Sequence, residues 1–65
     1  MRNRVRELRS ARGWTQEELG KRLGVSRQAV IAIESDKHDP SLDLAFRIAA
    51  LFGEAVEAVF DNPHA

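Results

Sequence analysis

Arg27 and Gln28 are the residues of this sequence best equipped for specific polar recognition. An arginine guanidinium offers two parallel N–H donors, and a glutamine amide offers a donor beside an acceptor. Arginine can pair in this way with a guanine edge and glutamine with an adenine edge, each pair contributing about 1–3 kcal/mol of discrimination. Both residues follow Ser26, a favoured helix N-cap, so they would stand at the start of a helix. The alternatives are an ordinary solvated helix start and, for Arg27, a contact with a phosphate.

Ile31 and Ala32 lie about one turn further along the same predicted helix. Ala32 shares a face with Gln28 but is too short to hydrogen-bond; it could permit close approach or meet a thymine methyl group. Ile31 could contact thymine methyls or the sugar–phosphate edge, or it could pack under the loop that contains Lys37. The sequence leaves both possibilities for Ile31 open.

The sequence contains no assembled set of groups for catalysis or metal binding. It has no cysteine, and His38 has no second His or Cys at ligand spacing. Glu17 and Glu18 fit a helix capping box, and no nucleophile, base and orienting group stand together. We therefore expect no enzymatic activity, no metal, no cofactor and no small-molecule substrate.

Charge is unevenly distributed along the 65 residues, although the formal net charge is zero. Residues 1–30 carry eight basic and three acidic groups, and residues 31–65 carry two basic and seven acidic groups. A basic half and an acidic half suggest one face for phosphates and another turned away from them, although charge also scatters by chance in short chains. No apolar run reaches membrane-span length, so we expect a cytoplasmic protein.

Five helices are predicted from the apolar spacing and the capping residues, in a single all-α domain over residues 1–65. Their approximate ranges are 3–12, 15–23, 27–35, 42–52 and 55–60. Val30 and Ile33 share the inward face of the third helix. Gly24 ends the second helix and Ser26 caps the third, so only three or four residues connect the two. Such a short connection favours a steep crossing, the helix-turn-helix geometry, over about residues 15–35.

The ordered set of motifs resembles the phage repressor and Cro family, often called the XRE family. The resemblance rests on Gln16-Glu17-Glu18-Leu19, Leu23-Gly24-Val25-Ser26-Arg27-Gln28, Ile33-Glu34, Pro40-Ser41-Leu42, Leu44-Ala45, Ile48-Ala49 and Leu51-Phe52-Gly53. The resemblance covers about residues 3–60, and the chain is similar to the family's small stand-alone bacterial and archaeal members, which implies a nucleoid-associated protein of bacterial or archaeal type. It implies a compact five-helix repressor-like fold and a sequence-specific double-stranded DNA-binding regulator, expected to be a repressor.

The resemblance also implies roles for residues outside the start of the third helix. Gln16 matches a residue that bonds a DNA phosphate, and Arg9 and Glu34 match a partly buried ion pair. Ser26 could contact phosphate as well as cap its helix, and Lys37 and His38 would flank the groove from the loop beyond. Trp14 occupies an apolar position usually filled by Leu, so we expect it to pack rather than bind.

Such regulators usually bind near-palindromic operators as dimers, with recognition helices about 34 Å apart. The apolar C-terminal segment, about residues 52–61, exceeds what one small core should cover, so we expect a two-fold homodimer there. The residues concerned are Phe52, Val56, Val59 and Phe60. The alternative is a protein-interaction module, such as an antitoxin-like member of the fold.

Overall fold

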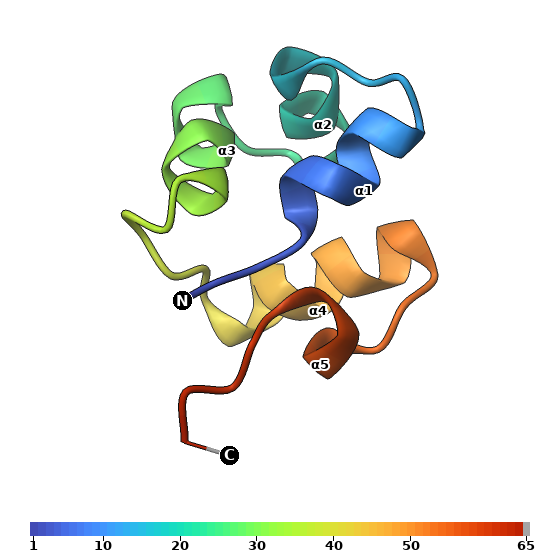
Figure 1. The fold of residues 1–65 in the computed structure, drawn as a ribbon. Helices are drawn as coiled ribbons and strands as arrows, with labels where there is room; N and C mark the ends of the chain where they lie inside the picture. The colour runs from blue at the N-terminus through green and yellow to red at the C-terminus, as the bar shows by residue number, and fades with distance from the viewer. Residues whose placement is uncertain (65) are drawn as a thin grey trace.

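The computed structural model describes residues 1–64, and within them it is all-helical (Figure 1). The five helices are α1 (Val5–Ala11), α2 (Gln16–Leu23), α3 (Arg27–Glu34), α4 (Leu42–Phe52) and α5 (Val56–Val59). The predicted all-α class and five-helix architecture are therefore confirmed. The bounds of α4 match the prediction, whereas α1 and α5 are both shorter than expected.

Three helices begin with a side-chain cap at the residue that the sequence indicated. The hydroxyls of Thr15, Ser26 and Ser41 each accept a hydrogen bond from the amide three residues on, at 3.0, 3.1 and 3.1 Å. These bonds satisfy amides that would otherwise lack a helical partner. A capping box would also have Glu18 accept a bond from the Thr15 amide, and this return bond is not formed among the described residues. The Glu18 carboxylate lies 3.1 Å from Arg22 instead, because a residue one turn along α2 is within easier reach.

The turn between α2 and α3 is tight because Gly20 allows two backbone segments to touch. The Val25 amide donates to the Gly20 carbonyl at 2.9 Å. A Cβ at Gly20 would lie only 2.8 Å from the Val25 carbonyl oxygen. Gly24 then ends α2 with a left-handed φ of 73°, a conformation that glycine adopts without steric cost. The steep crossing of α2 and α3 thus depends on a glycine that the capping pattern alone did not single out.

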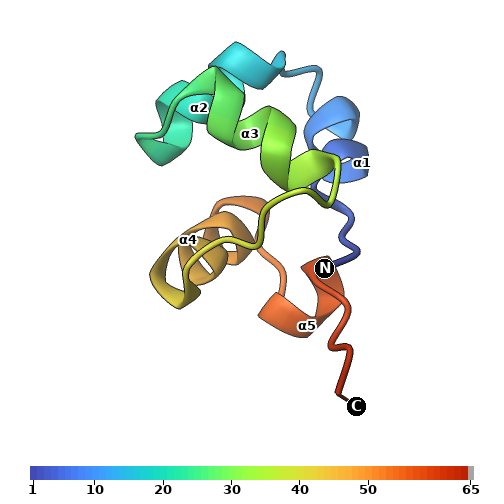
Figure 2. The ribbon, with the colours of Figure 1, turned by 90° about the vertical axis from the view of Figure 1, so that its left-hand side faces the viewer.

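The core lies where the five helices meet. Leu19 from α2 and Ile48 from α4 are fully buried, and Val30 and Ile33 cover the inner face of α3. The α4 helix runs beneath α1, α2 and α3, with α5 below it (Figures 1 and 2). Trp14 is half-buried against this core, with its ring centroid 5.8 Å from that of Phe52, as a packing role predicts. This frame holds α3 on the outer surface.

The two ends of the chain pair with each other. Asn3 and Phe60 form an isolated antiparallel bridge. The Arg4 amide donates to the Val59 carbonyl and the Asp61 amide to the Arg2 carbonyl, both at 2.8 Å. This extended pairing is the reason that α1 begins at Val5 and α5 ends at Val59. No helix of residues 1–64 is long and apolar enough to cross a membrane.

Candidate nucleic-acid interface

The first turn of α3 presents Arg27 and Gln28 to solvent. Val30 and Ile33, on the inner face of the helix, are 1% and 2% exposed. Burial of that face fixes the rotation of α3 about its own axis, which leaves Gln28 on the far side and Arg27 at its flank, both exposed. Figure 2 shows α3 crossing the front of the molecule, where a duplex could approach it.

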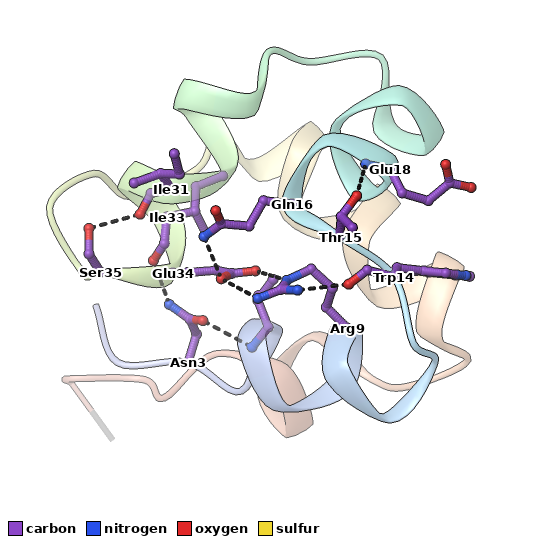
Figure 3. A network of polar contacts seen from close by, with 11 residues as sticks. Asn3, Arg9, Trp14, Thr15, Gln16, Glu18, Ile31, Ile33, Glu34 and Ser35 are labelled. Carbon is purple, nitrogen blue, oxygen red and sulfur yellow. Dashed lines mark hydrogen bonds and ion pairs between the residues drawn. The ribbon is translucent and has the colours of Figure 1, made fainter.

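A partly buried ion pair joins α1 to the end of α3 (Figure 3). Arg9 Nε lies 2.7 Å from Glu34 Oε2, and a second guanidinium nitrogen lies 3.2 Å from Glu34 Oε1. The third guanidinium nitrogen donates to the Trp14 carbonyl at 2.7 Å. The side chains of Arg9 and Glu34 are only 13% and 4% exposed. This bidentate arrangement places α3 relative to α1 and to the start of α2.

Gln16 is connected to the same network. Its Nε2 donates to Glu34 Oε1 at 3.2 Å (Figure 3). An amide nitrogen carries two hydrogens, so one N–H remains for another acceptor. Glu34 therefore orients Gln16 at the first turn of α2, where helix amides and the helix dipole also favour an anion. The sequence resemblance indicated Gln16 but not the contact that positions it.

A polar hollow of about 350 Å³ lies beside this network, between α1, α2 and α3. Its lining residues are Arg6, Arg9, Gln16, Ile31, Glu34 and Ser35. Ile31 lines the edge of this hollow and is half-buried, so part of its side chain packs against the domain and part is exposed to solvent. Arg6 was not singled out from the sequence. Its spacing of three residues before Arg9 on one helix face is the signal that could have found it.

The loop after α3 holds Lys37 and His38 in exposed positions. Their backbone amides donate to the Ala32 carbonyl at 3.0 and 3.2 Å, which binds the loop to the end of α3. Ser26 lies at the other end of the helix. The structure thus brings Gln16 and Ile31 together at one hollow. Lys37 and His38 follow one end of α3 and Arg27 and Gln28 stand at the other, with an eight-residue helix of about 12 Å between the two ends.

Asn3 is a second residue that sequence reasoning missed. Its side-chain nitrogen donates to the Ile33 carbonyl at 2.9 Å and to Asp36 Oδ1 at 3.2 Å (Figure 3). Its side-chain oxygen accepts from the Val5 amide at 3.0 Å. Asn3 therefore bonds the first amide of α1 and the end of α3 at the same time. Asn side chains commonly bond a backbone amide two residues on, so the residue type could indicate the bond to Val5, but no local pattern indicated the contact with α3.

Comparison with known proteins decides the family. The model of a family described as "Helix-turn-helix", of the XRE type, matches residues 5–58. The chain belongs to this XRE-type helix-turn-helix family. α2 and α3 are its helix-turn-helix, and the predicted resemblance is confirmed.

The relatives of this helix-turn-helix protein are transcriptional regulators by name. A regulator from Methanocaldococcus jannaschii is 53% identical over 60 residues, which cover 92% of this chain and 91% of the relative. YgzD from Bacillus subtilis is 48% identical over 60 residues, with the same coverage. The protein is thus a DNA-binding transcriptional regulator, a non-enzymatic class.

A solved structure has the same fold. The hypothetical transcription factor NHTF from Neisseria superposes with a TM-score of 0.75 at 33% identity, covering 83% of this chain. This chain spans 61% of the NHTF chain. The likeness extends over most of the helix-turn-helix domain and leaves over a third of that longer protein unmatched.

The residues predicted to form the dimer interface differ in how far they are exposed in the helix-turn-helix domain. Phe52, Val59 and Phe60 are only 6%, 1% and 3% exposed within a single chain. Val56 alone is half-buried. One core covers more of this segment than expected, because α5 folds under α4 and the Asn3–Phe60 bridge closes over its end. Phe52, Val59 and Phe60 therefore have little exposed surface for contact with a partner.

Proposed function

We propose that this regulator is a repressor that reads a near-palindromic DNA site as a homodimer, with α3 as the recognition helix. The observation that carries the proposal is the exposed pair Arg27 and Gln28 at the start of α3, on a helix whose inner face is buried. An N-terminal pair of this kind can reach base edges when the helix enters the major groove. Ala32 and Ile31 would form the apolar part of the same contact.

Contacts with the DNA backbone would surround the base contacts made by α3. Gln16 carries a free N–H at the first turn of α2, beside the hollow that also contains Arg6. Ser26, Lys37 and His38 stand at the two ends of α3 and complete the set that we assign to phosphates. Contacts of this class set the register and the salt dependence of binding and carry no base preference.

Repression would follow from occupation of the operator by the protein. A dimer whose recognition helices lie about 34 Å apart covers more than one duplex turn. Bound over a promoter, such a dimer would exclude polymerase without any further contact. The sign of regulation can be measured by transcription in vitro from a promoter that contains the selected site.

Selection of bound sequences from random duplex DNA tests this function. We expect a near-palindrome with half-sites about one turn apart and a preference over scrambled DNA of about 10³ or more. Affinity is measured at two salt concentrations for both duplexes. Enrichment of no sequence, with residual binding that vanishes in salt, would contradict the proposal and favour a protein-interaction module.

A further inference from the structure

The loop after α3 begins with a residue in an unusual backbone conformation. Asp36 has a φ of 62°, the only positive φ of a non-glycine residue within residues 1–64. Aspartate enters this left-handed region more readily than most residues, but the conformation costs free energy and persists where other contacts hold it. The turn at Asp36 lets the next two amides, of Lys37 and His38, both donate to the Ala32 carbonyl, at 3.0 and 3.2 Å. The directions of Lys37 and His38 therefore depend on how firmly Asp36 is held.

The Asn3 side chain bonds this turn from the other end of the fold. Its Nδ2 donates to the Ile33 carbonyl at 2.9 Å, to Asp36 Oδ1 at 3.2 Å and to the Met1 carbonyl at 3.3 Å, so two hydrogens are shared among three acceptors. The Ile33 carbonyl also accepts from the Asp36 amide at 3.2 Å. Figure 3 shows the Asn3 side chain between the start of α1 and the end of α3. Asn3 thus contacts both the backbone that precedes Asp36 and the Asp36 carboxylate.

Asn3 is itself fixed in place. Its Oδ1 accepts from the amide of Val5, the first residue of α1, at 3.0 Å. Its backbone forms the antiparallel bridge with Phe60, and the residue is half-buried. A side chain anchored in this way can restrain an exposed loop, because the rest of the domain restrains the side chain.

Resting on the function proposed above, we propose that Asn3 is a positioning residue for DNA binding. It holds Asp36, and Asp36 sets the directions in which Lys37 and His38 meet the DNA phosphates. Flexible side chains must be ordered when a complex forms, which costs affinity, whereas a loop that is already held in place avoids part of that cost. Asn3 does not contact the DNA; it acts through Asp36.

The same bond also directs a negative charge. Asp36 is exposed and stands directly before the two residues assigned to phosphates. A carboxylate turned toward a duplex would repel the phosphates, because like charges repel most strongly at short range. The bond from Asn3 draws the Asp36 carboxylate toward the N-terminal segment instead. Loss of that bond should therefore weaken DNA binding both through a looser loop and through a carboxylate that is free to approach the DNA.

Asn3→Asp tests the proposal, because aspartate has the shape of asparagine but no N–H donor. It keeps an oxygen for the Val5 amide, and a carboxylate suits the start of a helix, so the variant should fold. Against the duplex obtained by selection, we expect binding about tenfold weaker than that of the unchanged chain, the cost of ordering two side chains. Lys37→Ala should cost little further affinity in this variant, whereas Gln28→Ala should cost as much as in the unchanged chain.

An exchange of the two side chains separates position from charge. Asn3→Asp combined with Asp36→Asn leaves the net charge unchanged and lets position 36 donate a hydrogen bond to position 3. Asparagine also tolerates the left-handed conformation at position 36. This double variant should recover most of the lost DNA affinity and the full effect of Lys37→Ala.

Asn62→Asp is the matched control for added charge. The Asn62 oxygen, like that of Asn3, accepts a backbone bond, from the His64 amide at 2.8 Å. The C-terminal segment lies away from α3 in Figures 1 and 2. This variant should bind DNA nearly as the unchanged chain does, because salt screens a distant charge.

Three outcomes would overturn the proposal. They are no recovery in the double variant, an equal effect of Lys37→Ala with and without Asn3→Asp, and an equal loss of affinity in Asn62→Asp and Asn3→Asp. Hydrogen exchange of the Lys37 and His38 amides adds a readout that needs no DNA. Both amides should exchange faster in Asn3→Asp and recover their protection in the double variant.

Selection with the unchanged chain decides the function separately. If that chain prefers a base sequence but amide exchange and the effect of Lys37→Ala do not respond to Asn3→Asp, the role of Asn3 is wrong and the function stands. If no DNA sequence is preferred while amide exchange responds as expected, the function is wrong, and with it the role of Asn3 in DNA binding, and only its restraint of the loop remains.

Discussion

Single side chains of the proposed DNA contact differ in what they should do to binding. Gln28→Ala removes an exposed amide from the first turn of α3, with no internal hydrogen bond to lose. We expect a loss of about 1–3 kcal/mol in DNA affinity and relaxed preference at one base position. Gln16→Ala should instead weaken all sites about equally. Titration against the selected duplex and its single-base variants measures both effects, and unchanged preference in Gln28→Ala would exclude its base contact.

Removal of one partner of the Arg9–Glu34 ion pair should cost more stability than removal of one partner of any exposed ion pair among residues 1–64. Glu34→Ala leaves the Arg9 guanidinium 13% exposed and without its carboxylate, which should lower the free energy of unfolding by about 3–5 kcal/mol. Glu18→Ala is the control, because Glu18 and Arg22 are both over 40% exposed and their pair should contribute only about 0.2–1 kcal/mol. Urea unfolding compares the two, and equal losses would contradict the structural role of Glu34.

Residue types near the recognition helix were predictable, but their contacts with one another were not. Arg27 and Gln28 could be found from their side-chain chemistry and from the cap at Ser26. The bond from Gln16 to Glu34 joins residues 18 positions apart. Whether two such residues meet depends on the crossing of α2 and α3, which no local pattern fixes.

At the scale of elements, the α2–α3 turn is the part most sensitive to a small change. Gly20→Ala would place a Cβ 2.8 Å from the Val25 carbonyl oxygen, so one of the two helices must shift. We expect a loss of about 1–3 kcal/mol in stability, and weaker DNA binding beyond that loss.

Gly53 provides the comparison, because a Cβ there would meet nothing within 4 Å and only its φ of 67° is demanding. Asn tolerates that conformation, so Gly53→Asn should be much milder than Gly20→Ala. Thermal melts and amide NMR spectra distinguish them. Similar destabilisation by both changes would mean that backbone conformation, rather than close approach, makes Gly20 necessary.

Helix number and most helix starts followed from the sequence because caps are local. Ser26 and Ser41 each bond an amide only three residues away, so the signal and its effect lie together in the chain. The ends of α1 and α5 were predicted too long, because they are set by the pairing of Asn3 with Phe60. That contact connects positions 57 residues apart, beyond the reach of any periodic pattern.

For the whole molecule, the separation of charge should appear as salt dependence. Arg6→Ala removes a cationic group from the hollow beside Gln16, so the slope of log affinity against log salt should fall by about one. Arg4→Ala removes the same charge from α1's other side, where Arg4 pairs with Glu7 at 2.8 Å, and should leave the slope unchanged. Identical slopes for Arg6→Ala and the unchanged chain would exclude Arg6 from the phosphate contacts.

The basic and acidic halves were visible in the sequence, whereas the apolar surface was not. An apolar C-terminal segment could be recognised, but Phe52, Val59 and Phe60 proved to be core residues. The exposed apolar side chains Leu42 and Phe46 belong to α4, whose other face is buried in the core. Which apolar groups remain exposed is decided by how all five helices fit together.

The bridge between Asn3 and Phe60 also makes the domain modular. Because the two ends of the chain lie side by side, the fold occupies a single attachment point in any longer polypeptide. It can be appended at either end of another domain, or inserted into one of its loops, without altering the path of the host chain. The same geometry suits two domains joined in tandem by a short linker, which would replace a concentration-dependent dimer with an intramolecular one.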